Sequence, residues 1–143
     1  CWDEVSMKAI GTDGREYIIN LPKCSKEVED LNRSSLHLEA RALLKKKFPY
    51  STIYEEILLK GCKGIGATLT ADFFIPDFPI LVEVHGAQHY KFNKFFHGTE
   101  ASFKTSQSND LIKKTWAENN GIIYIELPFN EIKNWGKIID GYI

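Results

Sequence analysis

Two carboxylates in the chain, Asp72 and Glu83, are spaced so that they could share one metal ion. They lie on either side of residues 76–79, a segment that two prolines bracket, and proline favours turns between strands. If this turn closes an antiparallel hairpin with Ile75 opposite Ile80, Asp72 lies directly across from Glu83. Opposed residues have Cβ atoms about 4.5 to 5.5 Å apart, near enough for both carboxylates to bind one cation. The spacing therefore predicts a site for a divalent metal.

A histidine joins these carboxylates on the same strand. His85 follows Glu83 by two residues, so the period of two in a strand puts both on one face. The neighbours Phe73, Val82 and Val84 then alternate to the opposite face, where we expect a core. Each ionisable group alone could be an ordinary strand residue. Two opposed carboxylates repel each other unless a cation or a proton intervenes, and this favours a functional site for the set.

The segment from Asp72 to His85 resembles the signature of the PD-(D/E)XK nuclease superfamily. Asp72 is followed by ten residues and then by Glu83-Val84-His85, with His85 at the position of the usual lysine. The resemblance implies a restriction-endonuclease-like core that hydrolyses DNA phosphodiester bonds with Mg²⁺, for which Mn²⁺ could substitute. Because the lysine is replaced, His85 would orient or deprotonate the attacking water, the latter only in its neutral form.

Further positions are similar to the branch that contains the very short patch repair endonucleases and the phage-type EDxHD homing endonucleases. That branch has a helical glutamate before the strands, which Glu39 matches. The likeness continues through the turn at residues 86–89 and the later Asp-x-x-Lys of residues 110–113, and it covers about residues 35–128. The chain lacks a convincing ligand set for the structural zinc of the repair enzymes. This departure argues against the mismatch-repair subtype. The catalytic domain of a phage-type homing endonuclease is one role that the resemblance implies, and repair, recombination and restriction roles stay open.

The resemblance implies a set of catalytic positions, namely Glu39, Asp72, Glu83, His85, Gln88 and His89. Asp72 and Glu83 would be the metal ligands. Glu39 would reach the ion through a water, or hold a second ion, if its helix packs beside the hairpin. The metal would therefore be bound directly by strand residues, and the helix would contribute only through a water or a second ion.

The remaining catalytic positions would accept a proton or orient a water or the phosphate. His89 is the alternative to His85 as the general base, and Gln88 would orient a water on the metal or the phosphate. Asp110 could either have a role in the site or be the N-cap residue of a helix. Two other functions stay open: a non-catalytic nucleic-acid-binding module that retains a nuclease-like fold, and a metal-dependent hydrolase of small phosphate esters.

Basic and aromatic residues alternate in residues 90–97, a pattern typical of nucleic-acid contacts. Lysines neutralise phosphates, while aromatic rings stack on bases. An ordinary loop whose rings cap the core would have the same composition. The candidate DNA-binding residues here and in a later helix are Lys91, Lys94, Phe95, Lys113 and Lys114.

Hydrophobic periodicity and turn residues predict an α/β (α+β) fold. An N-terminal β-hairpin turns at Thr12-Asp13-Gly14, and the order ββ, α, βββ, α, β, α predicts a central mixed β-sheet flanked by helices. We expect residues 1–22 to form the hairpin extension and residues 23–143 a single compact nuclease core. The later elements are predicted as a helix at 35–47, strands at 52–59, 68–75 and 80–85, a helix at 109–119, a strand at 122–127 and a helix at 131–139.

Composition sets the remaining limits. The chain has 143 residues and a formal net charge of −1, which does not itself suggest a polyanion partner. Its three cysteines lack CxxC spacing, which favours a reducing, cytoplasmic compartment, and no membrane span is evident. The resemblance implies a phage or bacterial host. The absence of an initiating Met predicts a fragment of a longer chain with a further DNA-recognition domain. A homodimer stays open.

Overall fold

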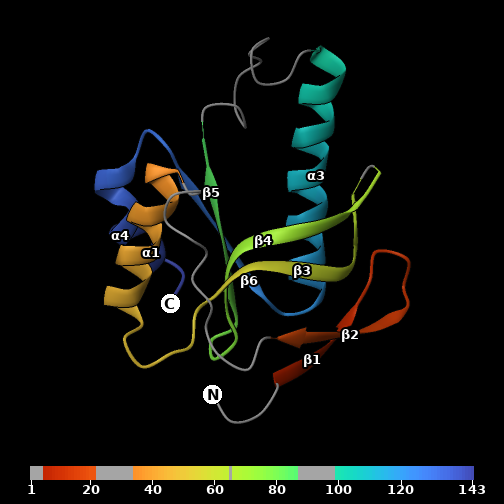
Figure 1. Cartoon of the computed structure of the whole chain (residues 1–143), viewed down its shortest axis with the longest axis horizontal. Coiled ribbons are helices and arrows are strands. Elements are labelled where there is room, and N and C mark those ends of the chain that lie inside the picture. Colours follow the sequence, from red (N-terminus) through yellow and green to blue (C-terminus); the bar gives the residue numbers. More distant parts are fainter. Residues whose placement is uncertain (1–4, 22–33, 65, 87–98) are drawn as a thin grey trace.

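The structure of the protein is a computed structural model that describes residues 5–21, 34–64, 66–86 and 99–143. Its strands and helices follow the predicted order along the chain (Figure 1). They are β1 (Val5–Ile10), β2 (Glu16–Leu21), α1 (Ser35–Lys47), β3 (Tyr54–Lys63), β4 (Thr68–Ile75), β5 (Ile80–His85), α3 (Glu100–Asn119), β6 (Ile123–Pro128), the 3₁₀ helix η3 (Ile132–Asn134) and α4 (Trp135–Asp140).

A four-stranded mixed sheet forms the centre of the molecule. Its strand order is β3-β4-β5-β6, in which the first three strands are antiparallel neighbours and β6 runs parallel to β5. The crossover from β5 to β6 contains α3, as parallel neighbours require a long connection. In the hairpin of β4 and β5, Ile75 pairs with Ile80 and Phe73 with Val82, which confirms the predicted register.

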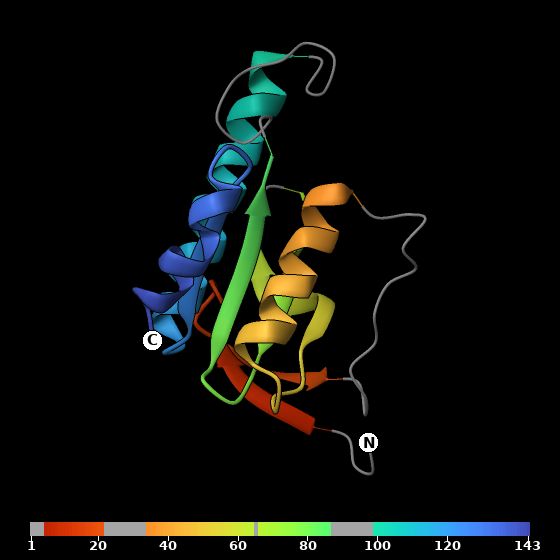
Figure 2. The same cartoon turned by 90° about the vertical axis from the view of Figure 1, so that its left-hand side faces the viewer.

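Helices cover both faces of this sheet, so the predicted mixed sheet flanked by helices is confirmed. Figure 1 shows α1 and α4 on one side of the sheet and α3 on the other, and Figure 2 looks onto the side of α1 and α4, with β5 between them. Phe73 and Val82 face α1 and α4, as expected from the alternation along the strands. The core on this side contains Ala40, Leu44, Phe48, Ile53, Phe73, Ile75, Ile80, Val82, Ile125, Leu127, Trp135 and Ile139.

The N-terminal hairpin packs onto the face that α3 covers. Its turn at Gly14 has a positive φ of 81°, which glycine adopts without strain. Ala9, Ile19 and Leu21 are buried in one core with Trp116 of α3. Residues 5–21, predicted as an extension, therefore contribute directly to a core that the central sheet shares.

The long helix differs most from its prediction. It begins at Glu100 and not near residue 109, with Thr99 as the N-cap whose side chain accepts a hydrogen bond from the backbone N of Ser102. Asp110 therefore lies within the helix, and its interpretation as an N-cap was wrong. Only Trp116 and Ala117 of α3 are buried. The first turns bury little surface, so their sequence lacks the apolar repeat that would have indicated a helix.

Candidate functional site

The two predicted metal ligands meet where β4 and β5 separate. The backbone ladder ends at Phe73 and Val82, and side chains continue it by one step. The backbone N of Asp72 donates to Oε2 of Glu83 at 3.0 Å, and the backbone N of Val84 donates to Oδ2 of Asp72 at 2.9 Å. One oxygen of each carboxylate is thus fixed to the opposite strand. The fork between the two strands brings Asp72 and Glu83 together.

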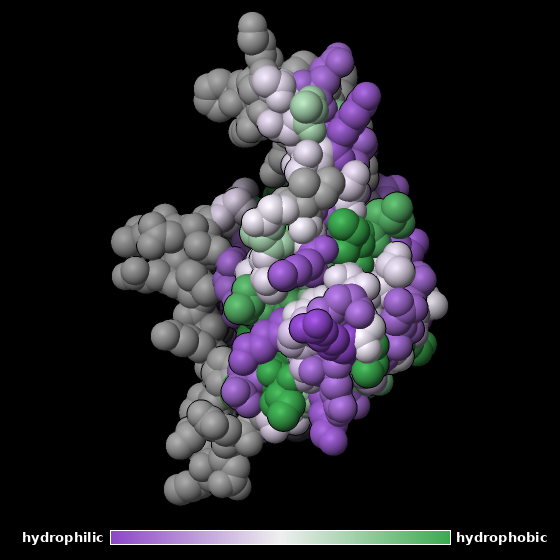
Figure 3. All heavy atoms as spheres, turned by 90° about the vertical axis from the view of Figure 1, so that its right-hand side faces the viewer, coloured by the Kyte–Doolittle hydropathy of each residue, from purple (hydrophilic) through white to green (hydrophobic). Residues whose placement is uncertain are grey.

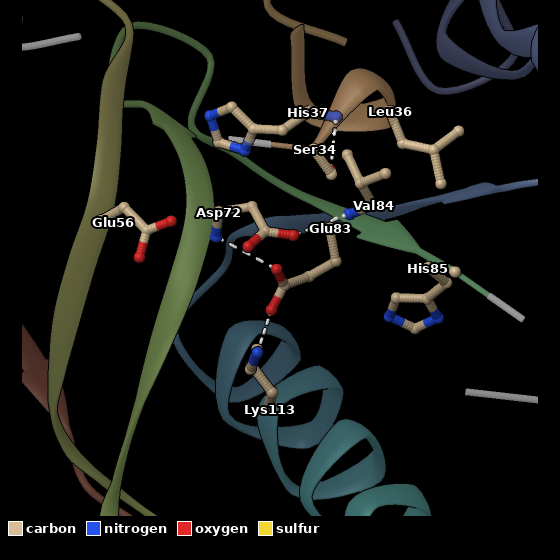
Figure 4. Close-up of a pocket in the computed structure, with 10 residues that line it drawn as sticks. Ser34, Leu36, His37, Glu56, Asp72, Glu83, Val84, His85 and Lys113 are labelled. Carbon is tan, nitrogen blue, oxygen red and sulfur yellow. Dashed lines mark hydrogen bonds and ion pairs between the residues drawn. The ribbon is translucent and has the colours of Figure 1, made fainter. Parts of the chain in front are cut away.

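These carboxylates line a pocket of about 400 Å³. Figure 4 shows them between α1 and α3, in the fork of the two strands. Walls of the pocket come from α1 and its N-cap, from three strands of the sheet and from α3. The lining residues are Ser34, Leu36, His37, Glu56, Asp72, Glu83, Val84, His85, Gly86 and Lys113.

A lysine from α3 contacts the more deeply buried carboxylate. Lys113 Nζ forms an ion pair with Oε1 of Glu83, whose side chain is 3% exposed (Figure 4). Burial raises the pKa of Glu83 well above its ordinary value of 4.5, and the charge of Asp72 raises it further, while Lys113 opposes the shift. Lys113 therefore compensates only part of the negative charge in the fork.

The donor set fits a Mg²⁺ ion that shares its coordination with a substrate. Among the residues that the structure describes, no group of three or more His, Cys, Asp or Glu side chains is arranged to hold a metal. A closed protein cage is therefore not formed by these residues. Mg²⁺, however, usually takes only one or two carboxylates and completes its shell with waters and substrate phosphates. Asp72 and Glu83 supply that smaller set. The pKa of Glu83 is raised first by burial and then by the charge of Asp72, and a cation between the two carboxylates would lower it.

His85 lines the same pocket at the end of β5. It is 3% exposed, with Nδ1 at 3.6 Å from Oε2 of Glu126 and Nε2 at 4.0 Å from Oδ1 of Asp110. Glu126 pairs with Glu83 across the parallel strands β5 and β6. Both flanking carboxylates would stabilise a positive charge on the imidazole ring. The ring is thus placed to take up a proton next to the carboxylate fork.

A third carboxylate of the pocket was missed by the sequence analysis. Glu56 of β3 lies between two residues that pair with β4, because Glu55 pairs with Phe73 and Ile57 with Ala71. This register places Glu56 across from Asp72. Its φ of 54° is in the left-handed region, which costs a residue other than glycine roughly 1 kcal/mol or more. Its neighbours in the sequence gave no signal of this conformation.

α1 brings a histidine to the pocket in place of the predicted glutamate. Glu39 is exposed and does not line the pocket, whereas His37 lines it and is 6% exposed. Two residues along a helix are separated by about 200° of rotation, so the two side chains lie on nearly opposite faces. The structure therefore does not bring Glu39 to Asp72 and Glu83. The signal that could have identified His37 is its helical spacing. It lies one turn before Ala40 and two turns before Leu44, so it shares the buried face of the helix with them.

The other predicted site residues divide into two groups. Lys113 lies in the pocket, whereas Lys114 is exposed on α3. The second group lies outside the described residues and consists of Gln88, His89, Lys91, Lys94 and Phe95. The described part of the site therefore contains Asp72, Glu83 and His85 from the predicted set, together with Lys113, which was predicted to contact DNA.

The surface over α3 and the N-terminal hairpin is mixed in polarity. In Figure 3 its apolar atoms form small separate groups among hydrophilic ones. Scattered exposed apolar residues are normal and do not mark an interface. Exposed large apolar residues of these elements and of β3 are Ile10, Ile18, Leu58 and Leu111. In the described residues, no helix is long and apolar enough to span a membrane.

The raised pKa of Glu83 predicts how stability depends on pH in the presence of a chelator. The folded state holds the Glu83 proton to a higher pH than the unfolded state does, so the free energy of unfolding falls as pH rises above 4.5 through the raised value. Glu83→Gln lacks this group and should not show the same fall. We expect the melting temperature of the variant to exceed that of the wild type increasingly as pH rises. A melting-temperature difference between the two proteins that stays constant with pH would contradict the burial of an ionisable Glu83.

Comparisons with known proteins give two partial relatives. No protein-family model matches the chain, and no solved structure matches it. Uncharacterized protein 033L of Invertebrate iridescent virus 3 is 38% identical over 64 residues, which are 45% of this chain and 33% of that protein. Uncharacterized protein 307L of Invertebrate iridescent virus 6 is 36% identical over 61 residues, 43% of this chain and 31% of that protein. The matched segments thus span about a third of each relative, and the chain is similar to part of these viral proteins.

Proposed function

We propose that this chain is a Mg²⁺-dependent DNA endonuclease with a PD-(D/E)XK-type core. The observation that carries the proposal is the fork of β4 and β5, where Asp72 and Glu83 face one pocket that Lys113 also enters. Phosphodiester hydrolysis needs ligands for a cation, a positive group near the phosphate and an acceptor for the proton of the attacking water. The carboxylates, Lys113 and His85 supply all three in this pocket. The mixed sheet between helices is compatible with such a core.

Each of these residues has a separate task in the proposed reaction. Asp72 and Glu83 bind the ion, which when bound would neutralise charge on the phosphate and lower the pKa of a water. Lys113 stabilises the orientation of Glu83 and neutralises the negative charge that develops on the phosphate. His85 in its neutral form accepts a proton from the attacking water, and Glu126 and Asp110 then stabilise the imidazolium.

The substrate and setting are inferred from the resemblance and not from the relatives. The names of the two viral proteins state no activity. DNA as substrate, a homing-type role, a further DNA-recognition domain and a homodimer are part of the proposal. A cytoplasmic location, with a phage or bacterial host, stays a prediction.

A non-catalytic nucleic-acid-binding module is the second candidate. One observation favours it: the ammonium of Lys113 already contacts Glu83, where a metal ion would also bind. A permanent ion pair of this kind would occupy Glu83 without a metal. In that case Mg²⁺ would neither bind in the fork nor support cleavage.

Incubation with supercoiled plasmid tests the two candidates directly. With Mg²⁺ or Mn²⁺ we expect nicked or linear DNA, and an excess of chelator should prevent both products. The measurement is the fraction of supercoiled DNA that remains over time on a gel. Calorimetric titration of the protein with Mg²⁺ provides a second measurement that is independent of cleavage. Retention of DNA binding without cleavage or metal binding would favour the non-catalytic module.

A further inference from the structure

His37 belongs to a buried ionic cluster that the proposed reaction does not use. Its Nε2 lies 2.6 Å from Oε1 of Glu55, and its ring stacks on Phe73 with centroids 4.5 Å apart. Arg41 donates from Nε to Oε2 of Glu55 at 2.9 Å and from its Nη2 to Oε1 at 3.1 Å. All three charged or polar side chains are buried. Buried ion clusters contribute little net stability on average, so such a cluster on a pocket wall calls for a functional explanation.

The cluster determines which ring nitrogen of His37 can exchange a proton. Both oxygens of Glu55 accept charge-assisted hydrogen bonds from Arg41, and a carboxylate in this arrangement acts as an acceptor. Nε2 of His37 must therefore carry the hydrogen that lies between the ring and Glu55. Nδ1 is then the nitrogen that gains or loses a proton. A carboxylate that orients a histidine through one nitrogen leaves the other for proton transfer.

His37 and Lys113 approach the carboxylate fork from opposite directions. His37 comes from α1, which covers one face of the sheet, and Lys113 comes from α3, which covers the other (Figure 1). In Figure 4 the two side chains lie on opposite sides of Asp72 and Glu83. In an in-line displacement at phosphorus, the attacking and the leaving oxygens are also on opposite sides. His85, the proposed base, lies beyond Glu83 from His37 (Figure 4), so the two proton-transfer groups flank the carboxylates from different sides, which suits that geometry.

We propose that His37 is the general acid that protonates the leaving oxygen, an inference that rests on the proposed nuclease function. The oxygen of water forms a bond to phosphorus while the bond from phosphorus to the leaving bridging oxygen breaks. One water proton goes to His85, and the proton on Nδ1 of His37 goes to the leaving oxygen, which becomes a hydroxyl group. His37 then regains a proton from solvent, and His85 releases one.

A substrate whose leaving group needs no proton separates this role from a structural one. The cleavage position is first mapped on the plasmid, and a duplex is made with sulfur in place of the leaving bridging oxygen. A thiolate leaves without protonation. We expect His37→Gln to cleave the oxygen duplex about 10²-fold more slowly than the wild type and the sulfur duplex within roughly threefold of it. The ratio of the two rate losses is the measurement.

The glutamine variant is the conservative choice because its side-chain amide can still donate to Glu55. Its melting temperature and its DNA affinity in Ca²⁺ should match those of the wild type. His85→Gln is the matched control, and it should lose rate on both duplexes because the base is needed in either case. Equal rate losses of His37→Gln on both duplexes, or no loss on either, would overturn the role of His37 and leave the nuclease proposal intact. A wild-type chain that cuts neither duplex would overturn the nuclease function itself.

A measurement on the wild type covers the case in which His37→Gln does not fold. Nitrogen-15 NMR of the imidazole rings reports which nitrogen carries the proton. We expect neutral His37 to be protonated at Nε2, with Nδ1 changing its shift when Mg²⁺ and inorganic phosphate are added together. A proton on Nδ1 in the neutral ring, or an unchanged Nδ1 signal, would overturn the proposal.

Discussion

Asp72→Asn is expected to reduce Mg²⁺-dependent DNA cleavage to the level of a reaction without protein. The asparagine side chain keeps an oxygen that can accept from the backbone N of Val84, so the fork should stay closed. It loses the negative charge by which a carboxylate attracts a hard cation more strongly than a neutral amide oxygen does. The measurement is the single-turnover cleavage rate, together with the calorimetric affinity for Mg²⁺. DNA binding in Ca²⁺ should change little, because Asp72 is proposed to contact the ion and not the DNA backbone.

Asp77 provides a matched control for this change. It is an acidic residue of the same hairpin, but it is exposed in the turn and does not line the pocket. Asp77→Asn should therefore cleave at the wild-type rate. Wild-type activity in both variants would show that Asp72 is not part of the site. Equal loss in both would indicate that the hairpin tolerates no substitution, which melting curves would detect.

Lys113→Ala should have the second largest effect, a loss of roughly 10² to 10³ in cleavage rate, as is typical when a positioned electrostatic partner is removed. Lys113 is the group whose positive charge lowers the pKa of buried Glu83. Without it Glu83 binds its proton to a still higher pH, and the protonated acid is a poor metal ligand. The remaining activity should therefore need a higher pH than the wild type does. A rate profile against pH, measured under single turnover, tests both effects.

Substitution of Lys114 separates the effect of Lys113 on Glu83 from a general electrostatic attraction of DNA. Lys114 carries the same charge on the same helix but is exposed. Lys114→Ala should alter the salt dependence of DNA binding slightly and leave the pH profile unchanged. If both alanine variants lost the same factor in rate with unshifted profiles, Lys113 would act only as a DNA contact.

The central hairpin could be predicted from sequence because its information is local. Two prolines place the turn, and the alternation of apolar residues on either side fixes the register of Ile75 with Ile80. Once that register is known, Asp72 and Glu83 must approach each other. β3 was predicted to end near residue 59 but continues to Lys63. Gly61 therefore lies within the strand and not in a turn. A glycine inside a strand cannot be distinguished from a turn glycine by composition alone.

The walls of the pocket could not be predicted because they come from distant segments. Lys113 reaches Glu83 only because α3 packs across the sheet, and no local pattern encodes that approach. The choice between Glu39 and His37 depends on the rotation of α1 about its axis, which the tertiary contacts of Ala40 and Leu44 determine. Local sequence therefore predicted the two carboxylates, and the packing of helices on the sheet decided which residues surround them.

The hydrogen bonds between the two arms of the fork would also affect the entropy of the proposed ion binding. Oε2 of Glu83 and Oδ2 of Asp72 are already held by the backbone of the facing strand. Ordering a long side chain such as glutamate costs up to about 2 kcal/mol in lost rotamer freedom. In this fork that loss occurs when the chain folds. An arriving ion would therefore meet carboxylates whose rotamers are already selected, and its affinity would not be reduced by the cost of ordering them.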